Sequence, residues 1–269
     1  MRNFLAHYLM PANEVPDINN LRKFTTGDVR TDFFDTAAGG KYTGTTPEEW
    51  LKVRPAALRL IAASKSNHHF VKTHCPTIKI DGQDLIPPNL TAAAVYILRN
   101  PFDLAPSFAR HQGADLDTAI TRMTDPEMVM GTEQGIFEPL GRWDDHVRVW
   151  TEAPGLPLHI VRYEDLHARP GKTFSDLLSK FLRVNVEKPK LARVIKETSF
   201  EKMQSQEKAI GFHEKPAGME SFFTKGKSGV WMDDLTPAQV GRIREAFLPT
   251  LEKWYPELLK VTAKFSASA

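Results

Sequence analysis

The sequence predicts an α/β fold, with a mostly parallel sheet and helices on both of its faces. Short apolar segments alternate with longer amphipathic ones, which is the pattern of strands joined by crossover helices. Residues 92–98 form a continuous apolar run, as expected for a strand buried on both faces. Two further strands are predicted at 69–73 and 158–163. Ligands of such folds bind beyond the carboxyl ends of the strands, so we expect a site there.

Length and composition are those of an ordinary globular chain. The 269 residues suffice for one large domain, and we expect residues 1–269 to form a single domain. The net charge of +2 is too small to indicate nucleic-acid binding. The single cysteine, Cys75, excludes an intrachain disulfide and a cysteine-based zinc site, which fits a cytoplasmic location. The sequence contains no run of about 18 apolar residues, so no membrane span is predicted. No signal peptide is recognised either.

Helix signals lie between the predicted strands. Thr46 as N-cap, followed by Pro47 and two glutamates, predicts a helix from 46 to about 64. Further helices are predicted over 136–153, 170–183 and 237–260, and the chain is expected to begin within a helix. Residues 11–45 are rich in Pro, Asn, Asp, Thr and Gly and are expected to be irregular.

Polar side chains follow the first predicted strand. A period of two places Lys72 and His74 on one side and Thr73 on the other. An imidazole is well suited to take a proton near neutral pH, so the pair is a candidate catalytic site. A polar, exposed strand end is the simpler interpretation of the tripeptide taken alone.

Arg99 follows the apolar strand, and Asn100-Pro101 is a good helix start. An arginine beside a helix N-terminus is a natural anion site. Ser107 lies one turn after Asp103 and shares its face. The alternative is an ordinary capped helix whose arginine forms a salt bridge elsewhere.

Three other motifs are weaker. Gly226-Lys227-Ser228 looks like the end of a Walker loop, but Ser221 stands where that pattern needs glycine, which leaves a flexible basic loop over a phosphate or a surface loop. Adjacent His68 and His69 would point to opposite faces, so no metal site is predicted. Glu164-Asp165 is interpreted as a turn or cap rather than as a glycosidase pair.

Taken in order, five segments resemble the cytosolic-type, bacterial-like family of sulfotransferases that use 3′-phosphoadenosine 5′-phosphosulfate (PAPS). They are KTHCP (72–76), YILRNPFDLAPSFARH (96–111), VRYEDL (161–166), TSFEKM (198–203) and FFTKGKSGVW (222–231). The resemblance implies a fold like that of the P-loop nucleotide hydrolases. It also implies transfer of a sulfuryl group from PAPS to a hydroxyl or amine of a small acceptor, with release of 3′-phosphoadenosine 5′-phosphate (PAP) and no metal.

The resemblance also implies roles for individual residues. His74 would be the general base, and Lys72 would stabilise charge on the transferring oxygens. Arg99 and Ser107 would hold the 3′-phosphate of the cofactor. The residues expected to line the nucleotide are Tyr163, Thr198, Phe200 and Met203, and those expected to close over it are Phe222, Phe223, Lys225 and Gly226.

Two departures from the family accompany the match. Thr224 stands where the family usually has arginine, so one phosphate contact worth about 1.5–3 kcal/mol is lost or replaced. Residues 1–6 resemble the helix just after the family's phosphosulfate loop, so the chain is expected to start beyond that loop and its strand. An upstream start is the preferred explanation; a trimmed chain and a degenerate homologue are the others.

Two competing functions follow. A non-catalytic protein that binds PAP is one, because the phosphosulfate loop is absent, although Lys72 and His74 argue against it. A nucleoside-triphosphate kinase is the other, but this chain lacks the Walker loop that such a kinase needs. The acceptor is expected to contact residues 11–45, 75–90 and 112–140, which identify no substrate. The sequence predicts no oligomeric state.

Overall fold

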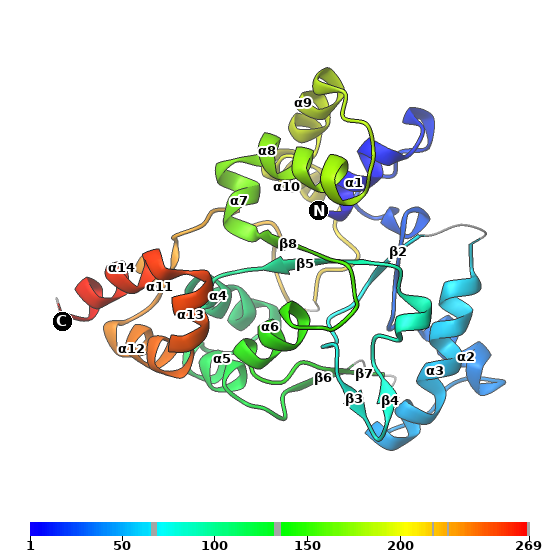
Figure 1. Cartoon of the computed structure of the whole chain (residues 1–269), viewed down its shortest axis with the longest axis horizontal. Helices are drawn as coiled ribbons and strands as arrows, with labels where there is room; N and C mark the ends of the chain where they lie inside the picture. Colours follow the sequence, from blue (N-terminus) through cyan, green and yellow to red (C-terminus); the bar gives the residue numbers. More distant parts are fainter. Residues whose placement is uncertain (66–68, 132–135, 217, 225, 268–269) are drawn as a thin grey trace.

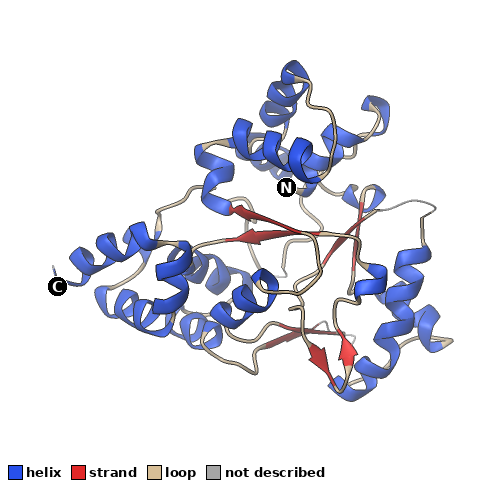
Figure 2. Cartoon of the chain, viewed as in Figure 1, coloured by secondary structure: helices blue, strands red, loops and turns tan. Residues whose placement is uncertain are grey.

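The computed structural model describes residues 1–65, 69–131, 136–216, 218–224 and 226–267. Short strands lie at the centre, and helices cover them from both sides (Figures 1 and 2), which confirms the predicted α/β class. The strands are β1 Thr25–Gly27, β2 Phe70–Lys72, β3 Lys79–Ile80, β4 Gln83–Asp84, β5 Ala94–Leu98, β6 Val129–Gly131, β7 Phe137–Pro139 and β8 Leu158–Arg162.

Helices make up most of the remainder. The chain up to residue 151 contains α1 Arg2–Leu9, α2 Thr31–Ala38, α3 Pro47–Ala63, α4 Pro101–Gln112, α5 Leu116–Met123 and α6 Trp143–Thr151. The rest of the chain contains α7 Tyr163–Ala168, α8 Pro170–Asp176, α9 Lys188–Glu197, α10 Phe200–Ile210, α11 Trp231–Asp234, α12 Pro237–Ala246, α13 Leu248–Trp254 and α14 Pro256–Ala267. Among the helices of the described residues, none is long and apolar enough to span a bilayer.

The strands that follow the predicted pattern pair in parallel. β5 lies beside β8 with Ala94 opposite Leu158, and β1 lies beside β2 with Thr25 opposite Phe70. The other two pairs, β3–β4 and β6–β7, are antiparallel. Within the described residues these four pairs do not join into one continuous ladder. The carboxyl ends of β5 and β8 point the same way, towards α4 and α7 (Figures 1 and 2).

Capping fixes the starts of two helices as predicted. At α3, the Thr46 side chain accepts from the Glu49 N–H, and Glu49 in turn accepts from the Thr46 N–H, which is a capping box. At α4, the Asn100 side chain accepts from the Asp103 N–H at 2.8 Å, and Pro101 occupies the first turn. Helix α4 ends at Gly113, whose φ of 58° is left-handed backbone that glycine adopts without strain.

Several predicted helices were wrong in their extent. The predicted helix 136–153 is strand β7 followed by α6, because Pro139 removes a backbone donor and Gly141, at φ 62°, turns the chain. Prolines also divide 237–260 into α12, α13 and α14, since α13 has a proline in its first turn and α14 begins at Pro256. The predicted helix 170–183 is α8 followed by a π-helical turn. The region 11–45, expected to be irregular, contains α2.

The apolar core forms several clusters around the strands. The largest joins β5 to α4, α6 and the C-terminal helices and includes Leu98, Phe102 and Trp231, all about 1% exposed or less. A second packs α1 against α8 and α9, where the rings of Phe4 and Phe174 stack. A third lies between α2, α3 and the β3–β4 hairpin. The strand ends are therefore supported from several sides.

A buried ion pair lies under the end of β2. Arg54, on α3, donates to an Asp28 carboxylate oxygen at 2.8 Å, and both side chains are at most 3% exposed. The same oxygen accepts from the Thr73 hydroxyl, also at 2.8 Å, and that hydroxyl accepts from the Cys75 N–H at 3.0 Å. Arg54 also donates to the Leu85 carbonyl and approaches the Cys75 thiol at 3.5 Å. This network fixes the backbone of 73–75.

We expect Arg54→Met to lower the free energy of unfolding by about 3–5 kcal/mol, because it leaves the Asp28 carboxylate buried without its cationic partner. Urea denaturation measures the loss. Arg59→Met is the matched control, since Arg59 lies on the same helix and is exposed; it should change stability by less than about 0.5 kcal/mol. Equal effects of the two substitutions would show that the buried pair does not stabilise this region.

Candidate active site

The end of β2 presents the first two predicted residues. Thr73 is bonded to Asp28 in the buried wall, whereas the side chains of Lys72 and His74 are 39% and 42% exposed. The Lys72 ammonium lies 3.8 Å from a carboxylate oxygen of Glu214, which also forms a two-bond pair with Arg2. Both side chains are thus partly exposed at the strand end, and that they share one side stays a prediction from their spacing.

Helix α4 brings His111 to the same place. Burial, and then the nearby charges of His74 and Lys72, hold the pKa of His111 below its ordinary value. A cavity of about 210 Å³ adjoins this histidine, lined by Arg110, His111, Gln112, Gly113 and residues 218–219. The end of β2 and the C-terminal end of α4 therefore form one polar region with an adjacent cavity.

Arg99 lies at the opposite end of α4. Its guanidinium stacks 4.4 Å from the centre of the Tyr163 ring, and its Nε is buried without a hydrogen-bond partner among the described residues. Glu164 accepts from both the backbone N–H and the side-chain amide of Asn100, at 3.0 and 2.7 Å. Glu164 thereby ties the ends of β5 and β8 together, and it does not cap its own helix α7, whose N-cap is Arg162. Ser107 lies further along α4, one turn after Asp103.

Two buried carboxylates hold the loop before α11. Glu207, on α10, accepts from the Ser221 hydroxyl and from the N–H groups of Phe222 and Phe223, at 2.7–2.9 Å. Burial raises the pKa of Glu207, but these donors outweigh it and hold the pKa below its ordinary value. At the other end of the loop, Asp103 accepts from the N–H groups of Gly229 and Trp231, at 2.7 and 3.1 Å, and from the Ser228 hydroxyl. The loop is thereby joined to α4.

Aromatic side chains of this loop pack against α10. Phe222 and Phe223 contact the Phe212 ring, and Phe200 meets Phe223 edge-on at 6.1 Å. Met203 is buried beneath them, and its sulfur accepts from the Asn3 amide at 2.8 Å. The Thr198 hydroxyl donates to the Val194 carbonyl. Gly226 lies against Phe200 with φ 55°.

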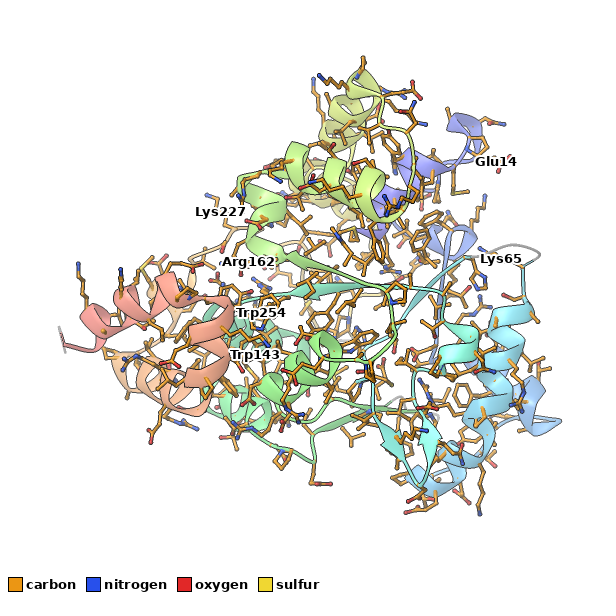
Figure 3. The ribbon with its side chains drawn as sticks, viewed as in Figure 1. Glu14, Lys65, Trp143, Arg162, Lys227 and Trp254 are labelled. Carbon is orange, nitrogen blue, oxygen red and sulfur yellow. The ribbon has the colours of Figure 1, made fainter. Side chains whose placement is uncertain are left out.

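The predicted residues therefore form two groups connected by α4. One contains Lys72 and His74, and the other contains Arg99 and Tyr163, with the aromatic loop held to α4 by Asp103. Since α4 has 12 residues, its length is about 18 Å. Figure 3 labels Arg162, at the end of β8, and Lys227, in the loop, on one side of the molecule. Lys225 and His68 lie outside the described residues.

Three glutamates of the site were not predicted. Glu138, at 2.7 Å from His74, lies in the segment interpreted as helix, although Pro139 and Gly141 indicate a break there. Glu207 lies on the amphipathic helix α10. The sequence pattern of that helix does not indicate which groups Glu207 binds. Glu214 lies in a loop far from Lys72 in sequence, so only the fold brings them together.

Comparison with known proteins identifies the relatives of the chain. The family described as "Sulfotransferase domain" matches residues 30–255. Sulfotransferase 1C2 of Oryctolagus cuniculus is 26% identical over 220 residues, which cover 76% of this chain and 69% of that protein. Sulfotransferase 1B1 of Mus musculus is 27% identical over 203 residues, covering 70% and 62% respectively.

Solved structures of similar fold were also found. Retinol dehydratase in complex with androsterone and the inactive cofactor PAP superposes with a TM-score of 0.62 at 19% identity, covering 93% of this chain and 77% of that one. Mouse sulfotransferase SULT7A1 complexed with PAP gives a TM-score of 0.55 at 18% identity, covering 90% and 88%. These structures support the predicted fold.

We expect Gly226→Ala to destabilise the loop, because a Cβ at this position would overlap the Phe200 ring and because the left-handed backbone disfavours a side chain. Gly229→Ala is the matched control: its φ of 82° carries the same backbone penalty, but no atom lies within 4 Å of the added Cβ. Thermal denaturation should show a larger loss for Gly226→Ala.

Adding Phe200→Leu to Gly226→Ala separates the contact from the backbone effect. The smaller side chain should recover part of the difference between the two alanine variants, as coupled neighbours do in a double-mutant cycle. Equal losses for Gly226→Ala and Gly229→Ala would show that the contact with Phe200 is unimportant.

Proposed function

Because the chain belongs to the sulfotransferase family of enzymes, we propose that it transfers a sulfuryl group from PAPS to a hydroxyl or amine of a small acceptor. Family membership favours this enzyme over a non-catalytic PAP-binding homologue and over a kinase. We further propose that residues 1–269 act as a single domain in this reaction.

The observation that carries the proposal is the environment of Arg99. A buried guanidinium nitrogen without a hydrogen-bond partner in the described chain, beside the N-terminus of α4, is suited to an anionic ligand. In the proposal this anion is the 3′-phosphate of PAPS, held by Arg99 and Ser107. The PAP complexes among the similar structures support the choice of ligand.

The nucleotide would then lie between α4, α7 and α10. Tyr163, Thr198, Phe200 and Met203 would line it in the proposal, and the loop would cover it through Phe222, Phe223, Gly226 and Lys225. Tyr163 is already stacked on Arg99, so its ring is fixed beside the proposed phosphate. Thr224 leaves one phosphate contact of the family without its arginine.

The reaction would occur at the other end of α4. His74 takes the proton of the acceptor hydroxyl or amine, whose lone pair attacks sulfur while the bond from sulfur to the bridging phosphate oxygen breaks. PAP leaves, and the Lys72 ammonium stabilises the charge that develops on the leaving oxygen. Because Lys72 is 3.8 Å from Glu214, an incoming phosphosulfate would compete with that carboxylate for it. Catalysis of this kind depends on positioning and on charge stabilisation. The proposed reaction includes no metal.

The acceptor would reach His74 from the cavity beside His111. Its volume of about 210 Å³ suits a small molecule or one end of a larger one. Two similar structures contain small acceptor-like molecules, androsterone and retinol.

PAP should stabilise the chain against thermal unfolding, and AMP, which lacks the 3′-phosphate, should not. A ligand at about 100 times its dissociation constant adds about 2.7 kcal/mol if it binds only the folded state.

Arg99→Met should weaken PAP binding about 10- to 100-fold, because it removes charge-assisted hydrogen bonds worth about 1.5–3 kcal/mol. Arg148→Met, an exposed position on α6, is the control and should not change PAP binding. Equal shifts with PAP and AMP would rule out the 3′-phosphate site.

His74→Ala should lower kcat about 10²- to 10⁴-fold, the usual contribution of a general base, and leave PAP binding unchanged. The control is His159→Ala. His159 lies near the amino end of β8, where its ring stacks on Phe181, and it is therefore far from the carboxyl ends of the strands. Sulfuryl transfer to a panel of phenols, alcohols and amines provides the assay. Full turnover by a folded His74→Ala chain would exclude His74 as the base.

A further inference from the structure

Glu138 is a buried acid in direct contact with His74. It lies in the middle of β7, opposite Met130 of β6, and is 7% exposed. Its Oε1 is 2.7 Å from the Nδ1 of His74, while the imidazole itself is 42% exposed. One ring nitrogen of His74 is therefore bonded to a carboxylate in the wall, and the ring is open to solvent at its other edge.

The carboxylate is ionised at neutral pH. Burial alone raises the pKa of Glu138, but the hydrogen bond from His74 and the charges of His74, Lys72 and Arg54 outweigh it and hold the pKa below its ordinary value. An ionised carboxylate only accepts hydrogen bonds, so Nδ1 of His74 must carry the proton. In a neutral ring, the lone pair is then on Nε2.

A second set of contacts fixes the backbone that carries His74. The Nε2 of His146 is 3.0 Å from the His74 carbonyl oxygen and must donate to it, because a carbonyl only accepts. The Tyr96 hydroxyl, 2.9 Å from Nδ1 of His146, then donates to that nitrogen. Burial lowers the pKa of His146, which agrees with a neutral ring. The indole of Trp150 donates to the next carbonyl, that of Cys75, at 3.2 Å.

We propose that Glu138 is a positioning residue for His74: it holds the ring as the Nδ1–H tautomer and so directs the basic Nε2 towards the acceptor. The inference rests on the proposed role of His74 as general base. When Nε2 takes the acceptor proton, the ring becomes an imidazolium whose Nδ1–H remains bonded to Glu138. No proton moves to the carboxylate, whose negative charge stabilises the cation.

Other titratable groups, charged or neutral, face this pair from the neighbouring elements. Lys72 comes from β2, His111 from α4, His146 from α6 and Arg54 from α3. Lys72 and His111 oppose protonation of His74 when they are charged, and Glu138 is the acid whose bond to the ring favours it.

The test compares the full-length chain with Glu138→Gln and Glu138→Asp, with Glu127→Gln as an exposed control. Nitrogen-15 NMR of the histidine rings reports the tautomer of His74 without any need for turnover. We expect the Nδ1–H form in the original chain and a smaller population of that form in Glu138→Gln, because the carboxamide can either donate to Nδ1 or accept from it, whereas the carboxylate only accepts. Glu138→Asp, which keeps the acceptor, should retain part of the Nδ1–H population.

Kinetics supply the second readout. In Glu138→Gln we expect kcat to fall at least about 10-fold, with KM for PAPS unchanged, because a misdirected base loses part of a contribution of about 10²- to 10⁴-fold. The acid limb of the kcat/KM profile should move to lower pH, since the imidazolium is no longer stabilised. Glu138→Asp should recover part of the rate, which a purely structural role for Glu138 would not predict, and Glu127→Gln should match the original chain.

Two outcomes would overturn the inference in different ways. If turnover requires His74 but a folded Glu138→Gln chain keeps the tautomer, the pH profile and kcat, the inference alone is wrong. If the tautomer changes as expected but His74→Ala retains full turnover, the proposed function of His74 fails, and the catalytic part of this inference fails with it.

Discussion

The guanidinium of Arg54 and the carboxylate of Asp28 are paired out of water directly beneath the end of β2. Thr73 and the Leu85 carbonyl supply further bonds to the pair, whereas Oδ1 of Asp28 and Nε and Nη1 of Arg54 have no hydrogen-bond partner among the described residues. Thr73 is held against Asp28, whereas the side chains of its neighbours Lys72 and His74 are partly exposed. Asp28 also holds the backbone of the candidates, because its own N–H donates to the Lys72 carbonyl at 3.0 Å.

Helix α4 transmits order from this region to the rest of the site. Its first turn bonds through Asn100 to Glu164, which links β5 to β8, and through Asp103 to the loop that precedes α11. Its last turn brings His111 to His74. A single helix therefore connects the proposed phosphate contact to the proposed base.

Patterns local in sequence predicted the parts of the fold that local physics decides. Strand β5 in the apolar run, the capped starts of α3 and α4 and the polar strand ends all depend on neighbouring residues. The predicted burial of β5 on both faces was wrong, because only Leu98 of the strand is buried and Ile97 is 42% exposed. The bonds of Glu138, Glu207 and Glu214 join segments up to 212 residues apart, as for Glu214 and Arg2, so no local pattern contains them. In the segment 136–153, the amphipathic second half is helical as predicted. The first half is not, because Pro139 and Gly141 keep the helix from starting before Trp143.

The thiol of Cys75 lies in the wall behind His74 and is fully buried. Burial raises its pKa to about 12, so it reacts with thiol reagents only when the wall opens and releases it to water. It is the only cysteine of the chain. The rate at which a thiol reagent labels Cys75 therefore measures how often the backbone around residues 73–75 opens locally. This rate distinguishes variants that destabilise that region from variants that change only the chemical step.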